Sequence, residues 1–506
     1  MRITFVHYEN ENPGIEYLSS ILKRNGHKVF LAFAPRLFGI RIIEQTPYFK
    51  KILGEIRKEL IEKVIISRPE LVAFSVYTQT YSWAQEIAKA IKKRIKVPII
   101  FGGIHTTLLP ETVIKNDCVD MICVGEGEDA IVDLANSLKQ GKPTNYRIPN
   151  IWFKKNGQII KNEVRPVIED LDSIPLPDKE LFYEQQPFMK KLYGLMTSRG
   201  CPFSCSYCHN SVLKKIYAGK GKYIRRRSVS NVLTELTWAK EKFKPKYIYF
   251  ADANFVSVDM DWLKKLLSRY KKEIGLPFWC RGHPDLITKE TVKLLKEAGC
   301  FILTMGIESV SEDIRKRVLK RPGSNKQIEF IARVCRQYKL RFSIDHIFNI
   351  PYETIKEQID ALEFYNSIRP RHITVYRLIY FPKLEIIEKA LESGNIDKET
   401  IARINMGKYV RSSTSGNGSI FKSEKEYRSF MFLFTVLPSI PRFLIKAISN
   451  KRELLLPFMK PSFIRAAYIL KIGIRVIISK RRWRYIGEIK NLIYRLLRAI
   501  KNRKDK

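Results

Sequence analysis

The chain of 506 residues is longer than one hydrophobic core usually supports, and its 45% hydrophobic content is enough for two or three domains. Lys and Arg number 91 against 51 Asp and Glu, and this net charge of +40 favours an anionic partner, although a lysine-rich proteome would produce the same excess. The opening MRITFVHYENENPG has no basic leader and no long apolar run, which excludes a typical secretory signal and predicts a cytoplasmic protein with reduced cysteines.

Residues 1–138 alternate short apolar runs with amphipathic stretches. The runs are RITFVHY, KVFLAF, LVAFSV, PIIFGG and MICVGE. Continuous apolar strands separated by helices predict a doubly wound α/β domain, with a parallel sheet covered on both faces. Ligands of such folds bind beyond the carboxyl ends of the strands, where this chain carries ENENPG, SVYTQT, GGIHTT and GEGE.

Residues 139–190 interrupt this alternation. The pair Asn156-Gly157 is a hairpin signal, and the proline-rich SIPLPD follows it. We interpret the segment as a linker that contains a hairpin.

Residues 191–395 resume the alternation with six apolar runs, each followed by a helical pattern. The runs are YGLMTS, YIYFAD, PFWCRG, FILTMGIE, FSIDHIF and ITVYRLIYF. Six strand–helix units predict a second α/β domain, an open or partial barrel with its active site at the carboxyl ends of the strands.

Residues 396–506 form a basic region that we predict to be helical, with RSSTSGNGS as a flexible joint. The uncharged SFMFLFTVLPSIP contains two prolines and is too short to span a membrane. Residues 451–506 hold 17 Lys and Arg against 3 Asp and Glu, with an apolar stripe at helical spacing. This pattern suits an amphipathic helix on the inner face of an anionic membrane. Packing of the stripe on the barrel and RNA binding are the alternatives.

The loop after the first strand of the second domain reads TSRGCPFSCSYCHN and brings Cys201, Cys205 and Cys208 together. Three thiolates so close in sequence can hold an iron–sulfur cluster. A zinc site that uses His209 as its fourth ligand is the alternative, although His209 directly follows Cys208 and would have difficulty facing the same ion. Single cysteines at five other positions are expected to be small buried side chains: Cys118, Cys123, Cys280, Cys300 and Cys335.

The CxxxCxxC motif, with Tyr207 before its last cysteine, resembles that of the radical S-adenosylmethionine (SAM) enzymes. The resemblance implies an oxygen-sensitive [4Fe–4S] cluster with SAM on its unligated iron, and an electron donor such as ferredoxin or flavodoxin. It further implies that Asp252 in FADANF binds the amino group of SAM, Arg281 in CRGHPD its carboxylate and Glu308 in MGIES its ribose. Charges at the barrel rim with no role in binding are the alternative for each.

Two segments depart from that family's pattern. FNIPYET carries Asn349 and Tyr352 where relatives have glycines, and we expect the larger side chains to alter the wall on the adenine side. YFPKLEI replaces the usual proline–glycine–threonine turn.

The order of the two domains, over roughly residues 1–395, resembles the cobalamin-binding branch of the same family. Methionine synthase-type domains carry D-x-H-x-x-G after the first strand, whereas here Glu11 occupies the histidine position and Gly14 the glycine position. Carboxylates ligate cobalt poorly, so the resemblance implies a lower cobalt face without a protein ligand. Ser75 and the pair Gly102-Gly103 correspond to residues that contact the cofactor's buried tail.

The GEGE loop with Gly125 and Glu126 matches a cofactor-binding loop of the same branch. His105 is expected to be a hydrogen-bonded turn histidine rather than a cobalt ligand.

The resemblance therefore implies a cobalamin-dependent radical SAM enzyme that methylates an unactivated carbon of a small-molecule or lipid-linked substrate. A non-methylating member of the branch, which cyclises or rearranges its substrate, is the alternative enzyme. A nucleic-acid-binding or cobalamin-sensing protein with a structural metal site is the alternative from another class.

Overall fold

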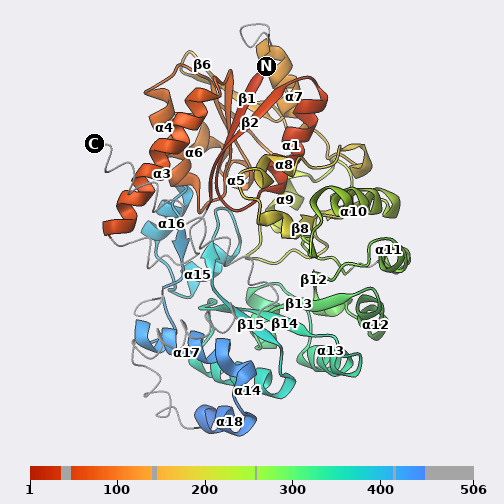
Figure 1. Ribbon diagram of the computed structural model, residues 1–506. Coiled ribbons are helices and arrows are strands. Elements are labelled where there is room, and N and C mark those ends of the chain that lie inside the picture. Colours follow the sequence, from red (N-terminus) through yellow and green to blue (C-terminus); the bar gives the residue numbers. More distant parts are fainter. Residues whose placement is uncertain (36–46, 140–144, 257–258, 414–417, 451–506) are drawn as a thin grey trace.

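The computed structural model places two α/β domains and a C-terminal helical region in one molecule (Figure 1). It describes residues 1–35, 47–139, 145–256, 259–413 and 418–450.

The first domain is built on a seven-stranded sheet of order β2-β1-β3-β4-β5-β6-β7. Its strands are β1 (Arg2–Glu9), β2 (Lys28–Pro35), β3 (Leu71–Ser75), β4 (Ile99–Gly102), β5 (Met121–Cys123), β6 (Ile151–Lys155) and β7 (Gln158–Ile160). Strands β1 to β5 pair in parallel, as their continuous apolar sequences predict.

Helices cover both faces of this sheet (Figure 1). They are α1 (Pro13–Arg24), α3 (Pro47–Ile66), α4 (Tyr81–Lys92), α5 (Ile104–Leu108), α6 (Pro110–Ile114) and α7 (Glu128–Lys139). Buried side chains of α1 and α7 pack on one face, and those of α3, α4 and α6 pack on the other. The doubly wound arrangement predicted for this domain is confirmed.

The predicted hairpin at Asn156-Gly157 is present, but it is part of the first sheet and not of a free linker. Strand β6 pairs antiparallel with β5, and β7 pairs antiparallel with β6. The physical reason is that β5 would otherwise leave one edge of backbone donors and acceptors unpaired. The connection to the second domain follows β7 and carries only short helices: η1 (Leu171–Ser173), α8 (Glu180–Tyr183) and η2 (Met189–Lys191).

The second domain has a six-stranded parallel sheet of order β15-β14-β13-β12-β11-β8, which is an open barrel wall. Its strands are β8 (Leu192–Leu195), β11 (Tyr247–Phe250), β12 (Phe278–Gly282), β13 (Cys300–Glu308), β14 (Phe342–Phe348) and β15 (His372–Arg377). The covering helices are α10 (Val229–Phe243), α11 (Met260–Glu273), α12 (Lys289–Glu297), α13 (Asn325–Gln337) and α14 (Ile355–Ile368).

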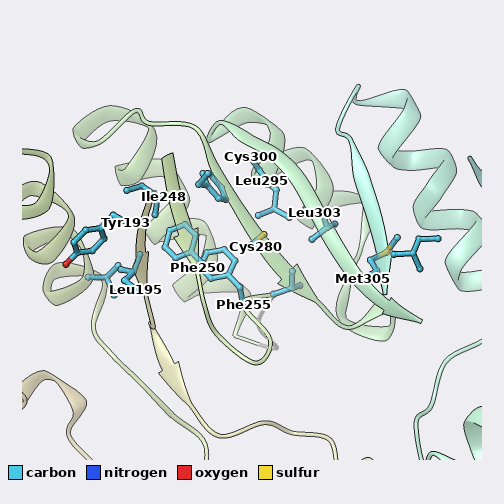
Figure 2. Packing of buried hydrophobic residues seen from close by; sticks show 14 of the residues in the cluster. Tyr193, Leu195, Ile248, Phe250, Phe255, Cys280, Leu295, Cys300, Leu303 and Met305 are labelled. Atoms are coloured by element: carbon cyan, nitrogen blue, oxygen red, sulfur yellow. The ribbon is translucent and has the colours of Figure 1, made fainter. Parts of the chain in front are cut away.

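Alternate side chains of this sheet form the core under the helices. Figure 2 shows Ile248, Phe250, Cys280 and Leu303 on neighbouring strands, in one apolar cluster with Leu295 of α12. Because successive side chains of a strand point to opposite faces, the remaining positions face the concave side of the wall. Short elements connect or flank the strands: β9 (Ser198–Arg199), α9 (Asn210–Ile216), β10 (Arg225–Arg226), η3 (Pro284–Leu286) and the π-helix η4 (Ile314–Val318).

The C-terminal region packs on both domains. Its elements are β16 (Ile379–Tyr380), α15 (Ile386–Glu392), α16 (Lys398–Asn405), β17 (Val410–Arg411), α17 (Glu424–Val436), η5 (Leu437–Ser439) and α18 (Arg442–Asn450). The uncharged segment SFMFLFTVLPSIP lies within α17 and η5, where Phe434 packs against Phe348 of β14 at a ring-centroid distance of 5.1 Å. In the described parts of the chain, no helix is long and apolar enough to cross a membrane. The predicted joint lies partly, and the tail 451–506 wholly, outside the described residues.

Candidate functional site

A cavity of about 750 Å³ lies between the two sheets, at the carboxyl ends of their strands. Its wall on the side of the first domain includes Ser75 and Gly102, which end β3 and β4. Its wall on the side of the second domain includes the cysteine loop, Gly282 and Glu308. Both domains therefore present their strand ends to one shared cavity, as the parallel sheets predict.

The cysteine loop lies between β9 and α9, and Cys201, Cys205 and Cys208 all line the cavity. Burial raises the pKa of the Cys201 and Cys205 thiols. In the described part of the chain, no three His, Cys, Asp or Glu side chains already surround a single ion position. A cubane cluster binds each thiolate to a different iron, so the loop fits a cluster without such a grouping. The other five cysteines are buried, as expected, and form no disulfide bond.

Arg321 is a site residue that the sequence did not reveal. It follows the π-helix η4, and its guanidinium donates two hydrogen bonds to the Gly306 carbonyl oxygen, from Nη2 at 2.6 Å and from Nε at 3.1 Å. Its Nη1 lies 3.6 Å from Sγ of Cys205. The side chain lines the cavity beside the cysteine loop, so it places a fixed positive charge there. Its segment LKRPGS follows Glu308 but matches no motif, so only the fold brings the two together.

Glu308 lies where the sequence predicts, at the carboxyl end of β13 and in the cavity wall. Burial raises its pKa to about 7, against the opposing effect of the Arg321 charge and of a hydrogen bond with Tyr207. A carboxyl group in this position can accept hydrogen bonds from hydroxyl groups of a ligand in the cavity.

Asp252 does not line the cavity, contrary to the role expected for it. Its side chain is 1% exposed, and Oδ1 accepts hydrogen bonds from the Thr197 amide at 3.0 Å and the Ser198 hydroxyl at 2.5 Å. The neighbouring Ala251 and Ala253 face the cavity instead. The reason is geometric, because successive side chains of an extended segment point to opposite sides. Asp252 thus holds the strand that leads into the cysteine loop.

Arg281 lines the cavity from the concave face of the second sheet. Its Nη1 lies 3.7 Å from Oδ2 of Asp345, and it forms a hydrogen bond with the Tyr376 hydroxyl. Its side chain is 46% exposed. Arg321, and not Arg281, is therefore the guanidinium next to the cysteines.

Glycines and small side chains shape the wall expected to hold cobalamin. Gly14, Ser75, Gly102, Gly103 and Gly125 all line it. Gly103 has a φ of +90°, and a Cβ there would lie 2.8 Å from the Val76 amide nitrogen. Only glycine allows the chain to turn this tightly. These small residues leave an open surface at the strand ends, which we call the cobalamin cradle.

Glu11 does not face this cradle, contrary to expectation. Its Oε1 accepts a hydrogen bond from Lys179 at 2.7 Å and one from the Tyr183 hydroxyl at 3.3 Å. Lys179 is almost fully buried and also pairs with Glu16 at 2.8 Å. A buried ammonium needs such carboxylates around it, so the charge of Lys179 holds Glu11 against the connection between the domains.

His105 is buried in the short helix α5 and not in a turn as expected, and it lies outside the cavity wall. Its Nδ1 lies 3.0 Å from the Thr78 hydroxyl, and its ring packs on Tyr81. Burial lowers its pKa to about 4, so the imidazole is neutral near pH 7.

Asn349 and Tyr352 adopt φ values of +61° and +63°, which explains why a glycine suits these positions. Neither side chain forms the cavity wall, contrary to expectation. Asn349 donates to the Ser413 carbonyl oxygen, and the Tyr352 hydroxyl lies 2.9 Å from Glu392. Both therefore tie the turn after β14 to the C-terminal region.

Two protein-family models match the chain. Residues 3–135 match the B12 binding domain, and residues 195–365 match the Radical SAM superfamily. An uncharacterized methyltransferase of Pyrococcus horikoshii is 28% identical over 302 residues, which cover 58% of this chain and 63% of that protein, less than two thirds of its length. The cytidylyl-2-hydroxyethylphosphonate methyltransferase of Streptomyces wedmorensis is 21% identical over 76% of this chain and 79% of its own. The anaerobic magnesium-protoporphyrin IX monomethyl ester cyclase of Cereibacter sphaeroides is 24% identical over 62% of this chain and 51% of its own.

Solved structures show the same fold. The cobalamin-dependent SAM radical enzyme OxsB, with aqua-cobalamin bound, superposes with a TM-score of 0.63 at 18% identity and covers 99% of this chain and 80% of its own. The methyltransferase TsrM from Kitasatospora setae, with cobalamin and a [4Fe–4S] cluster bound, superposes with a TM-score of 0.61 at 17% identity, over 78% of each chain.

Proposed function

Because the chain belongs to the radical SAM enzymes that carry a cobalamin-binding domain, we propose that it transfers a methyl group to an unactivated carbon of its substrate. The observation that carries this proposal is the shared cavity, because its wall contains both the three cysteines and the cobalamin cradle of the first domain. When bound there, the cluster would supply an electron that cleaves SAM, and cobalamin would carry the methyl group.

The residues around the cavity suggest how the cofactors are held. Cys201, Cys205 and Cys208 provide thiolates for a cluster, and Arg321 beside Cys205 provides a guanidinium for the carboxylate of SAM. Glu308 accepts hydrogen bonds from the ribose hydroxyls. This assignment replaces Arg281 by Arg321 near the cluster, and it assigns Arg281, held by Asp345 and Tyr376 on the concave face, to contact with the substrate.

Gly102 and Gly103 leave room for the buried tail of cobalamin, and the Ser75 hydroxyl, which accepts from Asn12 at 3.3 Å, lies at the end of β3 beside them. Among the described residues, no histidine lines the first-domain wall, because His105 is turned toward Thr78. The lower cobalt face would then have no histidine ligand from this wall. Electron paramagnetic resonance of bound cob(II)alamin should lack nitrogen splitting, and a clear nitrogen pattern would contradict this assignment.

The relatives favour methyl transfer but also support a second candidate. The Pyrococcus and Streptomyces relatives are named as methyltransferases, whereas the Cereibacter relative is named as a cyclase. We therefore keep cyclisation or rearrangement without methyl transfer as the alternative reaction.

The products of SAM distinguish the two reactions. The anaerobically reconstituted holoenzyme is supplied with reductant, CD3-labelled SAM and a small-molecule extract of its own cells. Methyl transfer predicts both S-adenosylhomocysteine and 5′-deoxyadenosine, together with an extract component that gains the CD3 label. Formation of 5′-deoxyadenosine without S-adenosylhomocysteine and without a labelled component would favour the alternative.

A further inference from the structure

We propose that Glu126 is a positioning residue that fixes the separation of the cobalamin cradle from the cysteine loop, through buried ion pairs between the two domains. This inference rests on the proposed function for the presence of both cofactors in one cavity. It assigns to Glu126 a role other than the cofactor contact that its motif suggested.

Three residues of this chain hold the carboxylate of Glu126, through three hydrogen bonds and one ion pair. Arg225 donates two parallel hydrogen bonds, from Nη2 to Oε1 at 2.7 Å and from Nη1 to Oε2 at 2.9 Å. Arg199 approaches Oε1 with its Nη1 at 3.2 Å, and the Ile168 amide donates to Oε2 at 3.1 Å. Both oxygens of the carboxylate are therefore already engaged by groups of this chain, through three hydrogen bonds and the ion pair with Arg199. Although Glu126 belongs to the cavity wall, its charge is directed into the domain boundary.

The two arginines stand at the base of the cysteine loop. Arg199 of β9 pairs with Arg225 of β10 in the antiparallel register, and the loop with α9 runs between these strands. Arg199 precedes Cys201 by two residues and donates from Nη2 to Glu128, the first residue of α7, at 2.5 Å. The loop is therefore bonded to the first domain immediately before its first cysteine.

A second contact holds the same loop from its far end. Tyr217 directly follows α9, and its hydroxyl oxygen accepts a hydrogen bond from the Glu126 backbone amide at 2.6 Å. The GEGE loop thus contacts residues on both sides of the three cysteines. A displacement of this loop relative to the second domain would have to break contacts with Arg199, Arg225 and Tyr217 together.

The network is balanced in charge and shielded from water. It contains two arginines and two glutamates, and the exposed fractions of their side chains are 4% for Arg225, 7% for Glu128 and 17% for Glu126 and Arg199. Burial alone raises the pKa of Glu126, but the hydrogen bonds and charges of Arg225 and Arg199 outweigh this effect and lower it. Removal of one member would leave a buried charge without a counter-charge, so the network resists separation of the domains.

The test measures geometry rather than turnover. Glu126→Gln keeps the side-chain shape but removes the charge, and Arg225→Lys keeps the charge but cannot donate two parallel bonds. Glu111→Gln is the matched control, because Glu111 lies in the same domain and its pair with Lys161 at 2.5 Å is about half exposed. The holoenzymes are compared by iron content, cobalamin affinity and the magnetic interaction between cob(II)alamin and the reduced cluster in paramagnetic resonance.

For Glu126→Gln we expect an unchanged iron content and a cobalamin dissociation constant within about threefold of that of the unsubstituted protein. The magnetic interaction between cob(II)alamin and the reduced cluster should become weaker, because the distance between the two is no longer held at one value. Arg225→Lys should shift the interaction in the same direction, which keeps the proposal testable if one variant does not fold. The control should match the unsubstituted protein.

A different result would show that Glu126 contacts the cofactor: cobalamin affinity falls by more than about tenfold, while the magnetic interaction at saturating cobalamin is unchanged. Two variants indistinguishable from the control would overturn the positioning role as well. None of these readouts requires methyl transfer, so failure of the proposed function would be seen separately.

Discussion

Glu353 carries a carboxyl group that is buried in the turn between β14 and α14, away from the cavity wall. Its Oε1 accepts a hydrogen bond from the Ser309 hydroxyl at 2.8 Å. Burial raises its pKa from 4.5 to about 8. Between these two pH values the folded protein binds a proton at Glu353 that the unfolded chain does not bind, so this group lowers the free energy of unfolding as the pH rises from about 4.5 to 8.

Glu353→Gln should remove this pH dependence. The substituted protein should lose less thermal stability than the original between pH 5 and pH 8, where each unit of pKa shift corresponds to about 1.4 kcal/mol at most. Melting temperatures across this range provide the measurement. Glu363→Gln, at an exposed position of α14, is the control and should follow the original curve. If the melting temperatures of all three proteins change with pH in parallel, the pKa of Glu353 is not raised by burial.

The cysteine loop gives a second prediction at this scale. Replacement of Cys201, Cys205 and Cys208 together by Ala should remove nearly all iron from anaerobically prepared protein, because these thiols supply the loop's ligands. Cys335→Ala, on the buried face of α13, should keep its iron. Iron and sulfide analysis measures both. Stoichiometric iron in the triple variant would contradict the assignment.

At the scale of elements, the turn after α16 joins the C-terminal region to the first domain. Gly407 has a φ of +79°, and a Cβ there would lie 2.6 Å from the Tyr81 ring and 2.8 Å from Nε2 of His105. The Thr112 hydroxyl donates to the Asn405 carbonyl oxygen at 3.1 Å in the same contact. Close packing at this turn therefore supports the helices behind the cobalamin cradle from a segment almost 300 residues away.

Gly407→Ala should destabilise the chain more than Gly394→Ala. Gly394 has a similar φ of +71°, but a Cβ there would meet no atom within 4 Å. Backbone strain alone costs about 1–2 kcal/mol, and the overlap at Gly407 should add about 1–3 kcal/mol. Urea unfolding of the full chain measures the difference. Equal losses in the two variants would mean that the turn can move away from Tyr81 without cost.

At the scale of the whole molecule, the basic segment 451–506 is the part whose role rests on sequence alone. The uncharged run before it belongs to the core of the second domain, so removal of everything after residue 400 would delete the buried Phe430 and Phe434 and uncover Phe348, on which Phe434 packs. A sharper test keeps the full chain and changes Arg481, Arg482 and Arg484 to Gln.

The full chain should sediment with anionic vesicles but not with neutral ones at physiological salt. Three fewer cations should weaken this binding by about 3 kcal/mol in total, since each contributes about 1 kcal/mol near headgroups. The control removes three exposed lysines of the second domain: Lys271, Lys289 and Lys326. If both triple variants bind like the original, the cations of the tail do not mediate membrane binding. The proposal of a lipid-linked substrate would gain support only if the arginine variant loses vesicle binding and the lysine variant keeps it.

The sequence by itself determined the properties that depend on local pattern. Apolar runs and their spacing predicted the parallel strands of both sheets, because alternation of buried strands and amphipathic helices is a property of neighbouring residues. The spacing of Cys201, Cys205 and Cys208, together with their position after β8, predicted the loop that lines the cavity. The glycines of the first domain were named by resemblance to a known family, and Gly103, with a φ of +90°, is one that the local backbone requires.

Only the tertiary structure decided which side chains of these motifs reach the cavity and which partners they have. Asp252 points away because its neighbours occupy the other side of an extended segment, and Glu11 is held by Lys179, 168 residues along the chain. Arg321 lies beside Cys205 across 116 residues, and Arg225 binds Glu126 across 99. Such contacts depend on how strands and loops pack within the second domain and on how the two domains pack together, and the free energy of that packing is distributed over many residues. The spacing of residues along the chain does not encode this packing. For this physical reason the motifs predicted where the site lies but not which charged side chains line it.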